Sequence, residues 1–429
     1  MTTVSTTPAV SSDAAPGLRV SWKTPITLGV FALLAVLLLV VFGRSGTSEF
    51  NFTASNAGAI QLEPLVMAGR PTSLVIAIVA VLMAVGSVLL ARFQRKTPLW
   101  YVSIFAVLLV TGFLVWASTG IPHQLHVTGL LVGALGLSTP LIFGSLGGVI
   151  SERVGVTNVA IEGQLLGGAF VSAVTATVTH SIAAGLVAAV VAGVLVSFVL
   201  GAFAIKYVVN QVIVGVVLNV LVLGLTTFLY QQVLLVNITA LNAPETLKPI
   251  AIPLLSEIPV LGPLLFDQNI IVYIMYVAVA AVTIGLFRTR WGLRLRSVGE
   301  HPQAADTVGI NVARTRFWNV ALAGAIVGLG GAYFTLGNIG GFTANISSGY
   351  GYIALAAVIF GGWHPIRATL AALMFGFATN LGSALGTFGS PVPNDFLLML
   401  PYVVTIFAVA GLVGRVRGPA AAGRPYIKS

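Results

Sequence analysis

Long apolar runs separated by short polar stretches dominate the pattern along this chain. A helix needs about 20 apolar residues to cross the ~30 Å hydrocarbon core of a bilayer, and most of these runs are close to that length. Twelve segments fit the pattern, at residues 25–43, 73–91, 99–119, 129–150, 158–179, 181–205, 209–234, 269–287, 317–337, 351–362, 366–388 and 395–414. The pattern therefore predicts an all-α polytopic membrane protein with about twelve membrane segments.

Helix composition divides the chain into four predicted parts. Residues 1–24 form a polar tail, and residues 25–128 hold three plain apolar helices rich in Leu and Val. Residues 129–415 form a core whose spans contain or adjoin Gly, Asn and other polar residues, and residues 416–429 form a second tail. Because small residues let helices pack closely in a membrane, we interpret 129–415 as the functional core and the first three spans as an extension.

Two glycine-containing stretches interrupt the core spans. They are GGVISERVGVTNVAIEGQLLGGAF (147–170) and GNIGGFTANISSGYGYIALAAVIFGG (337–362), and the span count puts the first on the inner side and the second on the outer side. Broken helices survive in a membrane only where protein or a cavity covers them. The two stretches indicate an inverted repeat, in which a substrate binds at the repeat interface.

Composition narrows the class of protein and of chemistry. Apolar residues make up 57% of the 429 residues and charged residues 7%, and the mean hydropathy is +1.01. A soluble domain of this size could not bury so much apolar surface. The absence of cysteine excludes a disulfide framework, thiol catalysis and a cysteine metal site. The five histidines are scattered, without carboxylates at ligand spacing, so we predict no metal site.

No motif for catalysis or for nucleotide phosphates occurs in the chain. It lacks the G-x-x-x-x-G-K-[ST] loop, whose backbone cradles ATP phosphates, and no nucleophile–base motif is visible. We therefore predict a transport subunit with no catalytic residues and no cofactor of its own.

The net charge is +10, and the distribution of Lys and Arg over the loops predicts how the spans are oriented. Only three of the 21 Lys and Arg residues, Arg44, Arg70 and Lys248, lie in predicted outer loops. Lys and Arg concentrate on the cytoplasmic side of membrane proteins, so we expect a multi-pass protein with both termini in the cytoplasm. Since the positive charge lies in short loops between spans, it does not indicate a nucleic-acid partner.

The loop at 288–316 contains six arginines between two apolar segments. In its middle, Pro302 suits the first position of a short helix and Gly309 suits its end, while Glu300 and Asp306 add acids for pairing with a partner surface. One interpretation is a docking element for a cytoplasmic protein; the other is an ordinary basic inner loop. The predicted docking residues are Arg294, Arg296, Gly299, Glu300, Pro302, Asp306 and Gly309.

Four long motifs of the core carry a family resemblance. In chain order they are SERVGVTNVAIEG (151–163), NQVIVGVVLN (210–219), GLRLRSVGEHPQAADTVGINV (292–312) and GYIALAAVIFGGWHP (351–365). With them the chain resembles, over about 129–415, the permease subunits of bacterial ABC importers related to branched-chain amino acid and ribose permeases. It looks most like the second, shorter paralogue of the simple-sugar/nucleoside branch.

This resemblance implies a fold, partners and a place in the cell. The implied fold is a ten-helix permease core with an inverted repeat, in which the loop at 292–312 contains the cytoplasmic coupling helix. The implied partners are a paralogous permease subunit in a heterodimer, a cytoplasmic ABC ATPase that binds ATP and Mg, and an extracytoplasmic substrate-binding lipoprotein. The implied location is a bacterial plasma membrane, with lipid around the spans and a small-molecule substrate in the pore.

Glu162 lies within a predicted span, where a charged side chain costs on the order of 3 kcal/mol on insertion scales. Asn158 is positioned to cap the helix that begins there, and Glu162 would lie one turn later, near the positive end of that helix. In one interpretation both residues contact substrate. In the other, Glu162 is structural and pairs with Arg153 or with backbone donors at the break.

Four more residues in or beside the spans are candidate substrate contacts. The amide of Asn219 can bond a ribose hydroxyl or a base edge, but it can equally join two helices. Phe342 and Asn345 offer an aromatic face beside an amide, which suits a nucleobase, although a turn-rich loop is the alternative. Asn380 is a further amide within a span.

Three kinds of function compete for this pattern. The first is the pore subunit of an ATP-driven importer, for nucleosides or for simple sugars such as ribose. The second is an ion-driven secondary transporter, which would also use broken helices and a membrane carboxylate but needs no docking helix. The third, a membrane-embedded enzyme, needs paired acids or histidines within spans, and Glu162 is the one acid available there.

Overall fold

The computed structural model describes residues 22–53, 62–121, 124–387, 392–393, 395–396, 399 and 417–427. The predicted span at 395–414 therefore lies almost entirely outside the described residues. The chain forms two compact units, one made of Met1–Glu49 with Leu65–Gln124 and the other of Phe50–Pro64 with Leu125–Ser429. Each unit is described by itself below.

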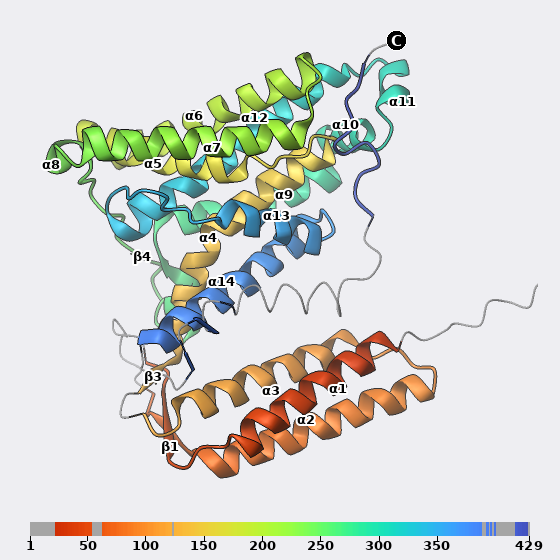
Figure 1. Ribbon diagram of the computed structural model, residues 1–429, viewed down its shortest axis with the longest axis vertical. Coiled ribbons are helices and arrows are strands. Elements are labelled where there is room, and N and C mark those ends of the chain that lie inside the picture. The colour runs from red at the N-terminus through yellow and green to blue at the C-terminus, as the bar shows by residue number, and fades with distance from the viewer. Residues whose placement is uncertain are drawn as a thin grey trace, which may run out of the picture. The chain divides into compact units, whose positions relative to one another are not determined.

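The first unit is built from three apolar helices (Figure 1). They are α1 (Lys23–Val36), which continues as the π-helical turn η1 (Leu37–Val41), α2 (Gly69–Arg92) and α3 (Leu99–Ser118), and strand β2 (Leu65–Ala68) precedes α2. Small residues such as Ala32, Ala80 and Ala84 face inward, while larger residues such as Leu33 and Leu82 are exposed. This arrangement suits helices that pack closely together and turn their bulky side chains to lipid.

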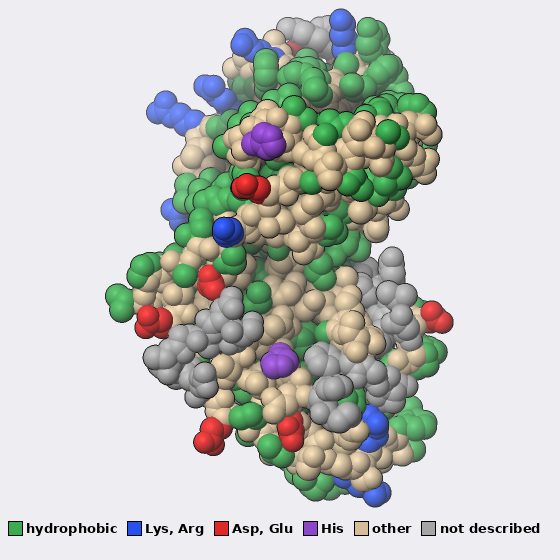
Figure 2. Space-filling view, turned by 90° about the vertical axis from the view of Figure 1, so that its left-hand side faces the viewer, with side chains coloured by type: hydrophobic (Ala, Val, Ile, Leu, Met, Phe, Trp, Pro, Cys, Tyr) green, Lys and Arg blue, Asp and Glu red, His purple; other side chains and the backbone are tan. Residues whose placement is uncertain are grey.

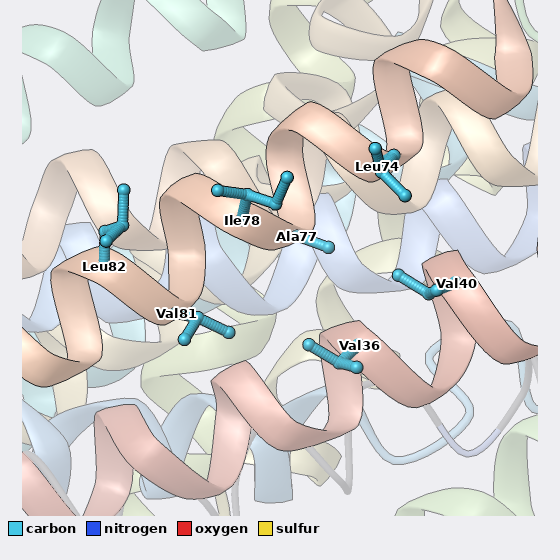
Figure 3. A pocket seen from close by; sticks show the side chains of 7 residues that line it. All are labelled: Val36, Val40, Leu74, Ala77, Ile78, Val81 and Leu82. Carbon is cyan, nitrogen blue, oxygen red and sulfur yellow. The ribbon is translucent and has the colours of Figure 1, made fainter.

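An apolar groove opens between α1 and α2 in this unit (Figure 3). Its volume is about 310 Å³, and its lining residues are Val36, Val40, Leu74, Ala77, Ile78, Val81 and Leu82. All seven are apolar, so the groove offers shape and dispersion contacts but no hydrogen-bonding group.

The second unit contains the remaining elements. In chain order they are β3 (Leu125–His126), α4 (Val127–Arg153), α5 (Ile161–Thr179), α6 (Ile182–Gly201), η2 (Ala202–Lys206), α7 (Gln211–Leu229), η3 (Tyr230–Leu234), α8 (Ile238–Leu241), β4 (Ile250–Ala251), η4 (Gly262–Phe266), β5 (Asp267–Gln268), α9 (Ile270–Arg288), α10 (Arg290–Glu300), α11 (Pro302–Thr307), α12 (Val312–Ala332), η5 (Tyr333–Ile339), α13 (Tyr350–Phe360) and α14 (Pro365–Thr387). Strand β1 (Thr47–Asn51) pairs in parallel with β3 through Phe50 and Leu125, and β4 pairs antiparallel with β5.

Ten helices in the described part of the chain are long and apolar enough to cross a membrane. They confirm the first nine predicted spans and the eleventh, and with them the prediction of an all-α polytopic membrane protein. On the face shown in Figure 2, apolar side chains are widespread and charged side chains are few.

The tenth predicted span is corrected by the structure. Helix α13 has only 11 residues, so it is about 16 Å long, roughly half of the ~30 Å hydrocarbon core. It packs against α4, α5 and α14 and is therefore a half-helix supported by full-length neighbours.

Glycines set the packing of the second unit, where α5, α6 and α12 run against one another (Figure 1). A Cβ atom added at Gly193 of α6 would lie 2.0 Å from the carbonyl oxygen of Gly324 in α12. No residue larger than glycine fits there unless the helices separate. This close approach gives the core a rigid wall beside its two breaks.

The two breaks predicted from the glycine-containing stretches are present. One separates α4 from α5, with Gly155 at φ +91°, and the other precedes α13, with Gly340 at +78° and Gly349 at +86°. Each break ends where a helix begins, so each leaves backbone N–H groups that the helix itself cannot satisfy.

Glu162, from the first turn of α5, satisfies the first turn of α13. Its Oε1 accepts hydrogen bonds from Ser347 Oγ at 2.6 Å and from Gly349 N at 2.8 Å, and its Oε2 accepts one from Gly351 N at 2.6 Å. A Cβ at Gly351 would lie 2.3 Å from Glu162 N, so only glycine lets the two helix ends approach this closely.

Asn219 of α7 satisfies the first turn of α5 in turn. Its Oδ1 accepts from Gly163 N at 2.8 Å, and its Nδ2 donates to the carbonyl of Val159 at 2.8 Å. Each helix that starts at a break is thus capped by a side chain from another helix. We call these two contacts, Glu162 on α13 and Asn219 on α5, the crossed caps.

The crossed caps predict the stability effect of changing Glu162. Glu162→Ala leaves two backbone N–H groups and one hydroxyl unpaired in the interior, and each unpaired group costs about 1–3 kcal/mol. We expect a clear drop in the thermal unfolding midpoint of the purified protein. Ser347→Ala removes a donor together with its bond, so its effect should be about 1 kcal/mol. An unchanged midpoint in Glu162→Ala, with transport alone lost, would mean that Glu162 acts on the substrate and not on the fold.

Candidate functional site

Asn158, predicted from the first break, belongs to a buried chain of hydrogen bonds. Asn158 Nδ2 donates to Gln164 Oε1 at 3.1 Å, and Gln164 Nε2 donates to Ser197 Oγ of α6 at 2.9 Å. The prediction that Asn158 caps α5 is wrong, because the N-cap residue is Ala160 and no side chain of its own segment caps the helix. Asn219 takes that role from α7.

The two structural interpretations of Glu162 have different outcomes. Pairing with backbone donors is confirmed by the bonds to Gly349 N and Gly351 N. Pairing with Arg153 is wrong, because the Nε of Arg153 donates instead to the carbonyl of Trp363 at 2.9 Å. A helix N-terminus attracts anions, and at α13 the carboxylate of Glu162 already occupies that position.

Asn219 links the crossed caps to an exposed aromatic residue. Its Nδ2 donates a second hydrogen bond, of 3.1 Å, to the hydroxyl of Tyr352 in the first turn of α13. The side chain of Asn219 is buried, whereas that of Tyr352 is half exposed. Tyr352 was missed by sequence reasoning, although it lies in the motif that begins at Gly351.

The residues of the second break differ in their environment. Phe342 is only 1% exposed, and its ring packs edge-to-face with Phe170 and Tyr230, at centroid distances of 5.1 and 5.9 Å. Its backbone N–H and carbonyl both bond the side chain of Asn242. Asn345, in contrast, is exposed and has φ +55°. Phe342 therefore packs in the core, whereas Asn345 is open to a ligand.

Asn380 lies apart from the breaks. Its Nδ2 donates to the carbonyl of Leu130 in α4 at 2.7 Å, and a Cβ at Gly133 would lie 2.8 Å from its amide. This amide joins α14 to α4, which is the helix-joining alternative for such residues.

The helix predicted in the arginine-rich loop is present as α11. Pro302 is its first residue, and the helix ends at Thr307. Gly309 has φ +84°, and the N–H of Ile310 donates to the carbonyl of Ala305 at 3.0 Å, which is the bonding of a Schellman end. The Pro start and Gly stop are thus confirmed.

Helices α10 and α11 expose both basic and apolar side chains. In α10, Leu293 is 62% exposed and lies beside the exposed Arg294 in the sequence. Val308, the residue that follows α11, is 75% exposed. Arg296 turns inward, with its guanidinium carbon 5.2 Å from the centroid of the Phe287 ring. We call the exposed part of α10 and α11, together with Val308, the loop face.

Four segments predicted on the inner side of the membrane meet at this end of the unit. The end of α4 contacts the α13–α14 turn through Arg153 and Trp363, and the indole N–H of Trp363 also bonds Glu152. A Cβ at Gly299 would lie 2.0 Å from the carbonyl oxygen of Arg153. The C-terminal segment 417–427 joins them, since Ala421 N donates to the carbonyl of Gly299 at 2.9 Å.

The C-terminal segment also contacts the two acids of the loop, Glu300 and Asp306. Glu300 Oε2 accepts from the N–H of Ala420 at 3.2 Å, and burial, together with the hydrogen bond and charge of Asp306, raises the pKa of the Tyr426 hydroxyl. Both acids thus have partners within the chain, while Glu300 remains exposed, so their pairing with a partner protein stays a prediction.

His364 lies in the turn between α13 and α14, at the same end. Its ring stacks on Phe287 at 4.8 Å. Burial lowers the pKa of His364, and the charges of Arg367 and Arg153 lower it further. Among the described residues, no group of three or more His, Asp or Glu side chains could hold a metal ion.

Comparison with known proteins agrees with this geometry. Residues 130–409 match the family "Branched-chain amino acid transport system / permease component". The guanosine ABC transporter permease protein NupQ of Bacillus subtilis is 42% identical over 301 residues, which cover 68% of this chain and 94% of that protein. No solved structure matches the chain.

Two permeases of Lactococcus lactis differ in their similarity to the chain. The nucleoside ABC transporter permease protein NupC is 39% identical over 320 residues, covering 71% of this chain and 98% of NupC. NupB, which carries the same description, is 26% identical over 207 residues, covering 48% of this chain and 56% of NupB. The resemblance drawn from the four motifs is confirmed: the chain belongs to the branched-chain amino acid transport system permease family.

Proposed function

We propose that this protein is the pore subunit of an ABC importer for nucleosides. The observation that carries the proposal is the similarity to NupQ and NupC, which extends over 94% and 98% of their lengths. Import of a simple sugar such as ribose is the second candidate, because the resemblance covers the sugar branch as well.

The proposed assembly contains three further proteins. A paralogous permease completes the pore, in line with the pair NupB and NupC in one organism. A cytoplasmic ABC ATPase binds ATP and Mg, because this chain has no phosphate-binding loop. An extracytoplasmic lipoprotein delivers the substrate. We place the complex in a bacterial plasma membrane with both termini of this chain in the cytoplasm, which agrees with the meeting of four predicted inner segments at one end.

The proposed substrate path runs beside the two breaks. Irregular backbone at membrane depth needs a cavity or a protein partner. Because the residues around Asn345 are exposed and non-helical, we propose that they line such a cavity. Asn158, Glu162 and Asn219 shape its wall through their hydrogen bonds, and Phe342 supports the wall from behind. Asn380 lies apart from the breaks, where it joins α14 to α4. Because Glu162 occupies the N-terminus of α13, the path favours an uncharged nucleoside over a phosphorylated one.

We propose the loop face as the docking surface for the ATPase. Leu293 and Val308 are exposed apolar side chains at the basic end of the unit, where lipid does not cover them, and exposed apolar groups of this kind mark interaction sites. Arg294 provides charge at the rim of this surface. The helices are held in position by Arg296, Gly299, Glu300 and Asp306, through contacts with Phe287, with α4 and with the C-terminal segment. Pro302 and Gly309 set the start and the end of α11.

The first test of this function is reconstitution in liposomes. The complete complex should accumulate radiolabelled guanosine or adenosine on addition of ATP, and excess unlabelled nucleoside should compete better than ribose. This chain alone should accumulate nothing, because it cannot hydrolyse ATP. Uptake by this chain alone, driven by a proton or sodium gradient, would support the secondary transporter instead.

A second test concerns the loop face. Val308→Asp places a charge in the proposed apolar contact, and charge burial without a partner costs several kcal/mol, so less ATPase should co-purify with the complex. Leu254→Asp is the matched control, since Leu254 is 81% exposed in a loop of the opposite end. Full retention of the ATPase by Val308→Asp would refute the assignment. Truncation after Gly418 removes the contacts of Glu300 and Asp306 with the C-terminal segment. The amount of ATPase that co-purifies with the truncated protein then reports the loop face without those contacts.

A further inference from the structure

Tyr352 combines an exposed ring with a fixed hydroxyl beside the crossed caps. The side chain is 48% exposed, and its hydroxyl accepts the hydrogen bond from Asn219 Nδ2. The described residues provide no acceptor for the hydroxyl's own proton. Tyr352 thus has an open aromatic surface and an unused hydrogen-bond donor.

The position of the hydroxyl is set by helices α5 and α7. Both ends of the Asn219 amide are held by the backbone at the start of α5, at Gly163 N and at the Val159 carbonyl. These two bonds fix the direction of the remaining N–H, which points to the hydroxyl of Tyr352. The group is pre-organised, so little entropy is lost when a ligand binds it.

The surroundings of Tyr352 indicate contact with water or protein and not with lipid. Residues 343–345 and Ser348 are exposed and non-helical, and lipid does not tolerate exposed irregular backbone. Tyr352 continues this surface, because a Cβ at Gly349 would lie 3.9 Å from its ring carbon Cδ2. The ring therefore borders the proposed substrate path.

The chemistry at this point suits a flat, uncharged ligand. Aromatic side chains stack on nucleobases, and a tyrosine hydroxyl gives a ligand a polar contact next to the apolar face. The carboxylate of Glu162 fills the nearby helix N-terminus, which removes the site where a phosphate group would bind.

We propose that Tyr352 is a binding residue of the substrate path, which stacks on the base of a nucleoside and donates its hydroxyl proton to it. This assignment rests on the proposed nucleoside function. It predicts that the complex distinguishes nucleosides from free ribose at Tyr352, because ribose has no ring on which tyrosine can stack.

Binding of radiolabelled guanosine to the purified complex without its lipoprotein tests the assignment, together with ATP-driven uptake. Tyr352→Leu should weaken guanosine binding on the order of tenfold, by loss of stacking. Tyr352→Phe keeps the ring and should stay within about threefold of the wild type, the effect of one lost neutral hydrogen bond. Both variants remove the acceptor of the Asn219 Nδ2–H, so both should lower the thermal midpoint by a similar small amount, and the difference in guanosine binding between them reports the contribution of the ring.

Ile359→Leu is the matched control, since Ile359 has the same exposed fraction of 48% and lies two turns further along α13. Its guanosine binding should equal that of the wild type. Unchanged binding in Tyr352→Leu overturns the assignment, as does an equal loss of binding in the Leu and Phe variants, which would make Tyr352 structural. If the wild-type complex takes up ribose but no nucleoside, the proposed function fails, and this result is distinct from a failure at Tyr352.

Discussion

The core of this protein depends on backbone N–H groups at two interrupted helices. In a bilayer an unpaired N–H costs several kcal/mol, and neither α5 nor α13 is capped by a side chain of its own N-cap residue. Glu162 caps α13, and Asn219 caps α5. Each break is therefore stable only when the other helices are in place. The two contacts of the crossed caps thus couple the helices α5, α7 and α13.

This coupling also determines which chemical groups face the proposed substrate path. A helix N-terminus directed at a cavity would attract an anion, but the carboxylate of Glu162 is already bound there. What remains open to a ligand is the ring of Tyr352 and the irregular stretch around Asn345. The same contacts that make the interrupted backbone tolerable thus leave a neutral, partly aromatic surface, as an uncharged substrate requires.

The sequence predicted the helical spans well, because apolar runs such as 73–91 and 269–287 carry a strong and local signal. The short helix at Pro302 and Gly309 was predictable for the same reason. Local signals could not reveal which residue caps which helix. Asn158 has the right type and spacing for a cap, yet Asn219 takes that role, 56 residues away in the chain from its partner Gly163. Partners so distant in the chain are set by tertiary packing.

Charged residues show the same limit at the basic end. The sequence predicts that Glu300 and Asp306 pair with a partner protein, because it does not show that the C-terminal segment 417–427 packs against the loop. The structure brings Ala420 and Tyr426 to these acids, which leaves Leu293 and Val308 as the exposed apolar groups of the loop. The docking role proposed for the loop requires that motion be transmitted between the ATPase and the membrane helices. The contacts of Gly299 with both α4 and the C-terminal segment tie the loop to the core, so a force on α10 or α11 reaches the end of α4, and with it the break that precedes α5.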